Sequence, residues 1–220
     1  MTDNIAENIS ENISENISEK KIINVPFSKK EVIKLKAGEY IYLTGTIYSA
    51  RDAAHKRMYD SINDAVEKNT AAAEYDGKKL FEAGILPFDI TDNVIYYLGP
   101  TPAKPGQVIG SAGPTTSTRM DKYTPLLLSK GLSGMIGKGK RGEAVVGAIV
   151  ENKAVYMAAV GGAGALLSKC IKESEVIAYD DLGTEAIRRM RVEELPVIVV
   201  IDAEGNNLYE TAVEEYKASR

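Results

Sequence analysis

The chain has 220 residues, of which 44% are hydrophobic and 26% are charged, a composition that suits a single domain with one substantial core. Its net charge of −4 argues against a general binder of nucleic acids or membrane surfaces, because either class needs a strongly positive face. No apolar run approaches the roughly 20 residues that cross a bilayer, and the acidic N-terminus lacks the apolar segment of a secretory signal.

The cysteine and histidine content limits the chemistry further. One cysteine excludes an intrachain disulfide, and with one histidine beside it a transition-metal or iron–sulfur site made by this chain alone is not expected. We therefore expect no metal bound by the chain itself. We also expect the cytoplasm as its compartment.

The first unit along the chain is a repeat. Residues 3–19 repeat Asn-Ile-Ser-Glu with small variations, so isoleucines recur every four positions. A helix would align them in a stripe that could dock on a partner, whereas the low complexity and acidity favour a solvated tail. We assign residues 1–20 as a flexible, low-complexity tail and residues 21–220 as one folded domain.

Strands and helices alternate along the folded part, which predicts an α/β fold. The ligand-binding loops of such sheets follow the strands, so the glycines and charges found there are the first place to search for a site. A loop-rich stretch is expected at 69–92, and Gly131 should close the second helix. We expect strands at 32–36, 40–45, 94–100, 134–137, 154–160, 176–179 and 197–202, and helices at 51–68, 121–130, 142–151 and 165–170.

The most informative loop is the segment 113–121, Gly-Pro-Thr-Thr-Ser-Thr-Arg-Met-Asp. Its hydroxyls could cap the following helix, but capping uses only one or two of them and leaves Arg119 unexplained. The free backbone N–H groups of a turn and the planar fork of an arginine both suit a carboxylate. We predict that this turn holds a small carboxylate.

Two basic segments could complete such a site. Arg51 and His55 lie four residues apart at the start of a predicted helix and share a face. They either solvate the helix end, or Arg51 presents its fork to a carboxylate at a helix N-terminus. In the second segment, glycines flank Lys138, so a backbone could approach a ligand there, while an exposed turn is the alternative. His55 is the one histidine, and a lone histidine on a helix is more often structural than catalytic.

Together these segments resemble the β subunit, or the equivalent C-terminal domain, of the iron–sulfur hydro-lyases, namely class I fumarate hydratase and L(+)-tartrate dehydratase. The resemblance covers roughly residues 21–209. The stretch 69–86 looks longer than in the family, and the repeat tail has no counterpart there. The segments that carry the resemblance, in the order of the family, are 45–57, 113–121, 138–139, 161–163 and 182–187.

The resemblance implies a single swivelling β/β/α-type domain that works in a hetero-oligomer. It implies a [4Fe-4S] cluster held by cysteines of a partner α subunit, with none bound by this chain alone. By position, Arg51, Arg119 and Lys138 would bind the carboxylates of a small dicarboxylate substrate. Thr115 would be the catalytic hydroxyl for proton transfer, and His55 and Thr116 are further candidates for the site.

The substrate is interpreted as fumarate or malate, because the segments 51–57 and 161–165 look more like the fumarate hydratases. The resulting hypothesis is the β subunit of a two-subunit enzyme that reversibly hydrates fumarate to L-malate, a reaction of the tricarboxylic acid cycle. An L(+)-tartrate dehydratase β subunit stays open as an alternative. A non-catalytic dicarboxylate-binding module is a second alternative.

Overall fold

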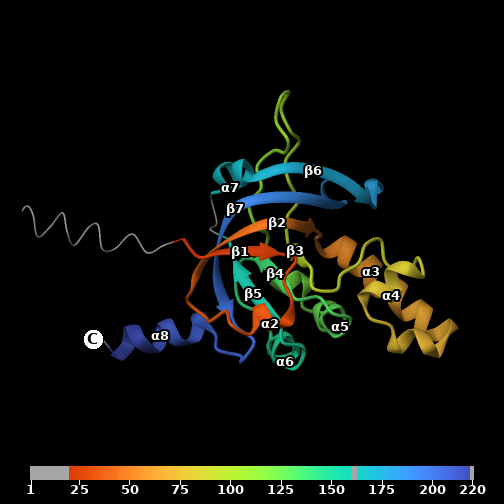
Figure 1. Ribbon diagram of the computed structural model, residues 1–220, viewed down its shortest axis with the longest axis horizontal. Coiled ribbons are helices and arrows are strands. Elements are labelled where there is room, and N and C mark those ends of the chain that lie inside the picture. The colour runs from red at the N-terminus through yellow and green to blue at the C-terminus, as the bar shows by residue number, and fades with distance from the viewer. Residues whose placement is uncertain (1–19, 160–162, 219–220) are drawn as a thin grey trace, which may run out of the picture.

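A mixed sheet forms the centre of the computed structural model, which describes residues 20–159 and 163–218. All of the predicted tail except Lys20 lies outside the described residues. Within these ranges seven strands run in the order β1-β2-β3-β4-β5-β7-β6, and β2 also pairs with β7 (Figure 1). That second pairing closes β2, β3, β4, β5 and β7 into a barrel. The strands are β1 Ile22–Val25, β2 Tyr40–Ser49, β3 Val94–Tyr96, β4 Gly134–Gly137, β5 Val155–Ala158, β6 Ile171–Ala178 and β7 Ile187–Ile201.

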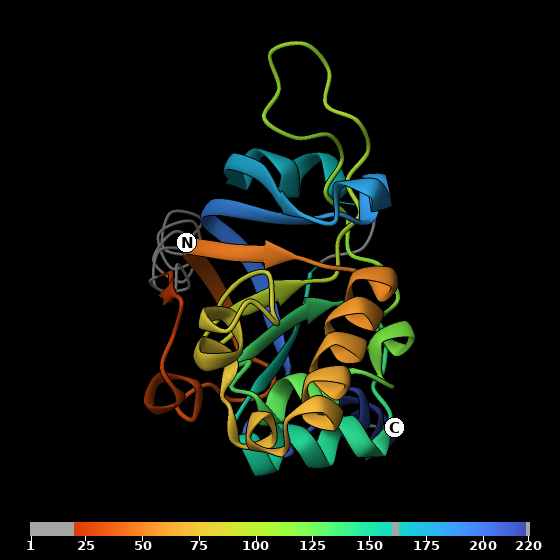
Figure 2. The ribbon, with the colours of Figure 1, turned by 90° about the vertical axis from the view of Figure 1, so that its right-hand side faces the viewer.

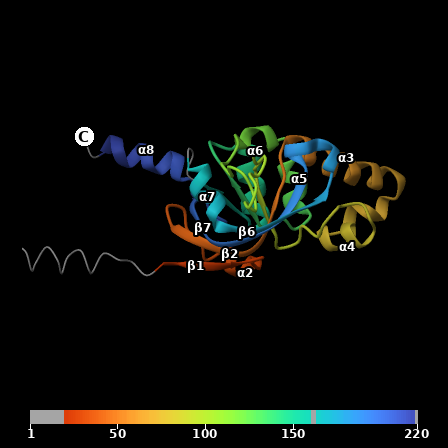
Figure 3. The ribbon, with the colours of Figure 1, turned by 90° about the horizontal axis from the view of Figure 1, so that it is seen from above.

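Helices α3 to α6 pack around the outside of this barrel (Figure 2), so the α/β prediction is confirmed. The loop 99–113 projects from the body in the same view, and α8 extends away from it when the molecule is seen from above (Figure 3). None of the helices in the described ranges has the length and apolar character to span a membrane. The helices are α2 Lys29–Val32, α3 Asp52–Lys68, α4 Gly77–Glu82, α5 Thr124–Ser129, α6 Glu143–Asn152, α7 Gly164–Cys170 and α8 Leu208–Ala218, with 3-10 turns η1 Thr70–Glu74, η2 Ser117–Met120 and η3 Asp180–Glu185.

The strand directions define one functional edge. Strands β1 to β5 are mutually parallel, whereas β7 runs antiparallel to β2, β5 and β6. The carboxyl ends of β2, β3, β4 and β5 therefore meet at the same edge of the barrel. Loops at this edge are the usual ligand site of parallel sheets.

The core lies on both faces of the central strands. Val94 and Tyr96 of β3 belong to one buried cluster, while the alternate residues Ile95 and Tyr97 belong to a second cluster that includes residues of α3 and α5. Because both faces of a parallel strand are buried, its sequence is a continuous apolar run rather than an alternation. This explains why the short runs at β3, β4 and β5 were readily predicted.

The predicted strand at 32–36 is wrong. Ser28 and Glu31 instead start the short helix α2, where the Ser28 N–H donates to Glu31 Oε2 at 2.8 Å. Val32 and Leu35 are buried three residues apart, whereas Ile33 between them is 45% exposed. This spacing of three fits one side of a helical turn, which an alternating pattern cannot distinguish over so short a run.

The two C-terminal strands are longer than predicted. β6 begins at Ile171 and β7 at Ile187, where the sequence is rich in charge. One face of this hairpin carries exposed ion pairs, including Arg189 with Glu175 at 2.7 Å, while Met190 and Val192 are buried on the other. The charged residues on the exposed face obscured the alternation of polar and apolar residues in these strands. The helix α8 that follows β7 was not predicted either.

The helix predicted at 121–130 begins three residues later, at Thr124, where α5 has Pro125 in its first turn. The residues before it form the 3-10 turn η2. Gly131 follows the helix with φ 106°, as predicted for a closing glycine. The stretch 69–92 is mixed, as expected, with only η1 and the short α4 in it.

Gly45 in β2 gives a test of how closely β1 packs on β2. Its φ is 131°, and a Cβ there would lie 2.0 Å from the carbonyl oxygen of Val25 in β1. We expect Gly45→Ala to lower the free energy of unfolding by about 2 kcal/mol or more, measured by denaturant titration. The matched control is Gly147→Ala in α6, where nothing lies within 4 Å. That change should raise stability by about 0.5–1 kcal/mol, and equal effects of the two substitutions would contradict the assignment.

Candidate active site

The threonine-rich turn is fastened to the carboxyl end of β3. The Thr115 N–H donates to the Tyr97 carbonyl at 2.8 Å, and the Thr115 hydroxyl donates to the same oxygen at 2.9 Å. Leu98 and Pro114 form an antiparallel bridge beside this contact. The turn predicted as a carboxylate site therefore lies at the ligand-binding edge of the barrel.

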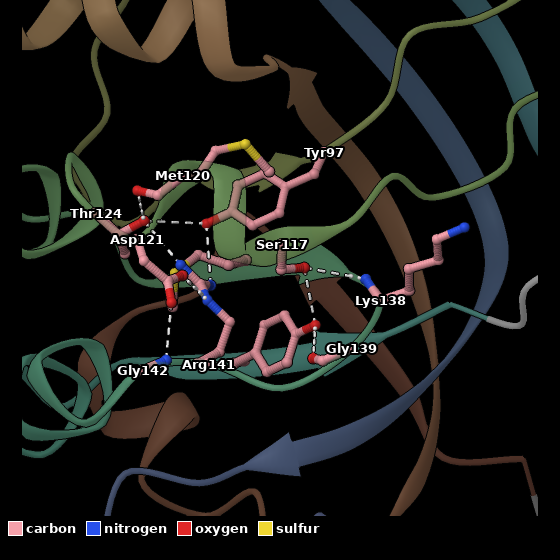
Figure 4. A network of polar contacts seen from close by, with 11 residues as sticks. Tyr97, Ser117, Met120, Asp121, Thr124, Lys138, Gly139, Arg141 and Gly142 are labelled. Carbon is pink, nitrogen blue, oxygen red and sulfur yellow. Dashed lines mark hydrogen bonds and ion pairs between the residues drawn. The ribbon is translucent and has the colours of Figure 1, made fainter.

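Lys138 lies next to this turn, directly after β4. It forms a parallel bridge with Thr116, and its carbonyl accepts the Ser117 N–H at 3.0 Å. Its side chain extends away from the buried residues around it and is exposed (Figure 4). Arg119 in η2 is exposed as well, and neither cation makes an ion pair with another described residue. The structure thus brings Thr115, Thr116 and Lys138 together on adjoining segments, with Arg119 four residues along the same turn.

Arg51 reaches the same edge from the end of β2. Its side chain lies against Gly99, where a Cβ would come within 2.8 Å of the arginine Cδ. Its Nη2 atom is 3.2 Å from Glu185 Oε1 and 3.6 Å from Asp52 Oδ1. The Arg51 charge is therefore partly balanced inside the chain, unlike the charges of Lys138 and Arg119.

His55 lies behind Arg51 and is completely buried. Its Nδ1 is 2.9 Å from the Arg51 carbonyl, so that nitrogen carries the proton and donates it to the carbonyl. Burial lowers the pKa of His55 to about 4, so the ring is neutral at pH 7. The imidazole therefore holds the Arg51 backbone through this hydrogen bond. Its ring packs edge-to-face with the Tyr97 ring, and the two ring centroids are 5.3 Å apart.

Arg141 follows Lys138 by three residues, yet its side chain is fully buried. Its Nε donates to Asp121 Oδ1 at 2.7 Å and its Nη2 to Thr124 Oγ1 at 2.8 Å (Figure 4). Its guanidinium also lies over the rings of Tyr97 and Tyr156, 5.3 and 5.0 Å from their centroids. A cation satisfied on every side cannot bind a ligand, so Arg141 is structural.

Asp121 joins the turn to the loop after β4. One carboxylate oxygen accepts from Arg141, and the other accepts the Gly142 N–H at 2.8 Å (Figure 4). The threonine-rich turn and the lysine loop are thereby held as one unit. The sequence contained a signal for this contact, since the segment 113–121 ends in Asp121 and the basic run after β4 ends in Arg141.

The part of the chain that the structure describes does not form a ligand set for an iron–sulfur cluster. Among the described residues no three His, Cys, Asp or Glu side chains are grouped to hold a metal ion. Cys170 in α7 is partly buried, and its Sγ lies 3.7 Å from the Glu194 carbonyl. Gly161 and Gly162, which belong to a segment that carries part of the family resemblance, lie outside the described residues.

The fold and this edge define an α/β barrel domain whose loops at the carboxyl edge carry hydroxyls, together with cations that have no ion-pair partner among the described residues. A family model, the fumarase C-terminus, matches residues 1–212, and the chain belongs to this family. The resemblance drawn from the sequence motifs is thereby confirmed.

Three relatives show how the chain compares in length. It is 37% identical over 180 residues to the anaerobic class I fumarate hydratase of Escherichia coli K12, and this match covers 80% of this chain and 29% of that protein. It is 35% identical over 189 residues to mitochondrial fumarate hydratase 1 of Leishmania major, covering 84% of this chain and 31% of that one. It is also 35% identical over 189 residues to a putative L(+)-tartrate dehydratase subunit beta of Methanocaldococcus jannaschii, covering 83% of this chain and 88% of that protein. The chain thus spans under a third of these fumarate hydratases and most of the beta subunit.

The histidine predicts a pH dependence of stability. Its folded-state pKa of about 4 lies below its ordinary value of 6.5, so between these pH values the unfolded chain binds a proton that the folded chain excludes. The stability that this contributes is complete above pH 6.5 and is lost as the pH falls toward 4, by at most about 3 kcal/mol. We expect an NMR titration of the single imidazole to show a midpoint near pH 4, and His55→Asn to flatten the unfolding free energy over this window. A midpoint near 6.5 would contradict the burial.

The Asp121–Arg141 pair gives a second prediction. Asp121→Asn leaves the Arg141 charge buried without a counter-ion, so the free energy of unfolding should fall by about 3 kcal/mol in denaturant titrations. Asp181→Asn is the control, because its partner Arg57 is exposed and such pairs contribute little. Equal stability of the two variants would contradict a stabilising ion pair between Asp121 and the buried Arg141.

Proposed function

We propose that this chain is the β subunit of a two-subunit class I fumarate hydratase, which reversibly hydrates fumarate to L-malate at a site shared with an α subunit. The observation that carries the proposal is the carboxyl edge of the barrel, where Thr115 and the exposed Arg119 belong to one turn and the neighbouring Thr116 is bridged to the exposed Lys138. The length of the match to a beta subunit supports the division into two chains.

The charges fit a small dicarboxylate. Its two carboxylates need two cations that are not already neutralised, and Arg119 and Lys138 meet that requirement among the described residues. The arginine presents a planar fork and the lysine a point charge. Arg51 is assigned a weaker role at the same edge, because Glu185 already offsets its charge. The exposed Thr116 hydroxyl stays a candidate contact, and His55 supports the backbone of Arg51.

Thr115 is proposed to exchange the proton at the substrate carbon. In dehydration this carbon loses a proton to Thr115 Oγ1 while the C–O bond on the neighbouring carbon breaks, and the departing hydroxide takes up a proton from an acid of the α subunit to leave as water. A threonine hydroxyl is a poor base, so its own proton has to pass to a second group. The group that it contacts in this chain is a carbonyl, which cannot take up a proton at neutral pH. We therefore assign the second group to the α subunit.

The iron–sulfur cluster is proposed to belong to the α subunit, because this chain lacks the cysteines to ligate it. When bound, such a cluster supplies a Lewis acid to the substrate. Lys138 and Arg119 would stabilise the negative charge that develops on the substrate during proton removal. Within the complex we propose that this chain acts as a swivelling β/β/α-type domain, in the cytoplasm.

An L(+)-tartrate dehydratase is the second candidate, favoured by the 88% coverage of the Methanocaldococcus jannaschii subunit. Both substrates carry two carboxylates, so the cations of this chain do not distinguish them. The additional hydroxyl of tartrate would be recognised by groups outside this chain. A direct comparison of malate and tartrate as substrates decides between the two.

The test is activity of the assembled pair. The full chain is purified with its α subunit under anaerobic conditions, and the conversion of malate to fumarate is followed. Arg119→Ala and Lys138→Ala should each lower kcat/KM by about 10²-fold, because each removes a charge from the developing anion. The control is Lys153→Ala, an exposed lysine after α6 that precedes β5 and so lies at the opposite edge. Turnover by the chain alone would refute the shared site, and binding of a dicarboxylate without turnover by the pair would favour the non-catalytic module.

A further inference from the structure

A closed set of hydrogen bonds surrounds the start of the lysine loop. The Lys138 N–H is 3.0 Å from Ser117 Oγ, which is 2.9 Å from the Tyr156 hydroxyl, and that hydroxyl is 2.8 Å from the Gly139 carbonyl (Figure 4). The set begins and ends on the adjoining residues 138 and 139. These hydrogen bonds do not involve Asp121 or Arg141, although the Arg141 guanidinium lies over the Tyr156 ring.

Only one arrangement of protons satisfies these contacts. A carbonyl only accepts, so the phenol proton of Tyr156 points at Gly139. The Ser117 hydroxyl must then donate to the Tyr156 oxygen, which leaves the serine oxygen to accept from the Lys138 N–H. Burial raises the pKa of Tyr156 well above its ordinary value, so the phenol keeps its proton at neutral pH. The three hydrogen bonds therefore all point the same way, from the Lys138 N–H to Ser117, from Ser117 to Tyr156 and from Tyr156 to the Gly139 carbonyl.

The residues around Ser117 leave room for its hydrogen bond to the Lys138 backbone. A Cβ at Gly137 would lie 2.0 Å from Ser117 Oγ, so glycine at the end of β4 is what lets the serine reach the lysine backbone. Ser117 and the Tyr156 ring are both fully buried. The Lys138 side chain, by contrast, has no polar partner among the described residues that would fix it. The position of its ammonium therefore depends on how firmly its backbone is held.

We propose that Ser117 and Tyr156 are positioning residues that hold the Lys138 backbone, and through it the ammonium, beside the threonine-rich turn. Neither residue needs to touch substrate. The catalytic consequence rests on the proposed function, in which Lys138 binds a substrate carboxylate. The structural part of the proposal, that Ser117 and Tyr156 hold the Lys138 backbone, concerns the folded chain alone.

The structural part is tested by amide hydrogen exchange on the full chain. Ser117→Ala should speed exchange of the Lys138 backbone amide by about tenfold or more, because that amide loses its acceptor. Tyr156→Phe should speed exchange of the same amide, because it removes the hydrogen bond to the Gly139 carbonyl and the acceptor that orients the Ser117 hydroxyl. Ser129→Ala is the control, since its hydroxyl donates to a carbonyl at the exposed end of α5. Tyr156→Phe keeps the buried ring, so it provides the result should Ser117→Ala fail to fold. Unchanged protection in Tyr156→Phe would overturn the proposal.

The catalytic part is tested by a double-mutant cycle in the complex with the α subunit. Ser117→Ala should lower kcat/KM by about tenfold with Lys138 present and cause no further loss when combined with Lys138→Ala. Additive losses would show that the serine does not act through the lysine, which overturns this part. An inactive wild-type pair would instead refute the proposed function, while the exchange experiment would still decide whether the loop is held.

Discussion

The pairing of β2 with β7 is the constraint on which the rest of the molecule depends. Without it, the parallel strands β2 to β5 would form an open sheet with β1 at one end and the β6–β7 hairpin at the other. With it, five strands close into a barrel and their carboxyl ends form a compact rim. The loops that carry Arg51, Thr115 and Lys138 follow the neighbouring strands β2, β3 and β4, so the parallel pairing places them side by side. The pairing of β2 with β7 then brings Glu185, just before β7, to Arg51.

The basic residues at this edge differ in burial and pairing, and therefore in role. Arg141 is buried, paired with Asp121 and enclosed by aromatic rings, and it joins two loops. Such a buried pair contributes little net free energy, because desolvation offsets the attraction, but it requires one specific arrangement of its partners. Arg119 and Lys138 stay exposed and unpaired among the described residues, which costs the chain nothing in desolvation and leaves their charge for a ligand.

The edge of the barrel is incomplete as a catalyst in chemical terms. It offers cations and a hydroxyl, and among the described residues the hydrogen-bond partner of the Thr115 hydroxyl is a carbonyl. In the proposed function such an edge binds and orients an anion, and the α subunit supplies the proton acceptor and the Lewis acid. The length of the match to a beta subunit supports that division.

The sequence by itself determined the α/β class, most of the central strands and the motifs that the family shares. It did so because parallel strands buried on both faces produce unmistakable apolar runs, and because glycines, hydroxyls and cations gather in the loops after them. Ser28 with Glu31 began a helix where alternation had suggested a strand, and the charged outer face of β7 hid most of that strand. Both errors arose where local pattern and tertiary context disagreed.

Only the tertiary structure decided what each basic residue does. Arg51, Arg119, Lys138 and Arg141 look alike as sequence, yet one is partly neutralised by Glu185, two are exposed and one is buried against Asp121. The partners of these cations lie far away along the chain, so the barrel has to close before their charges are either balanced or left free. Burial and pairing, which set the chemistry of a charge, are properties of the packed molecule.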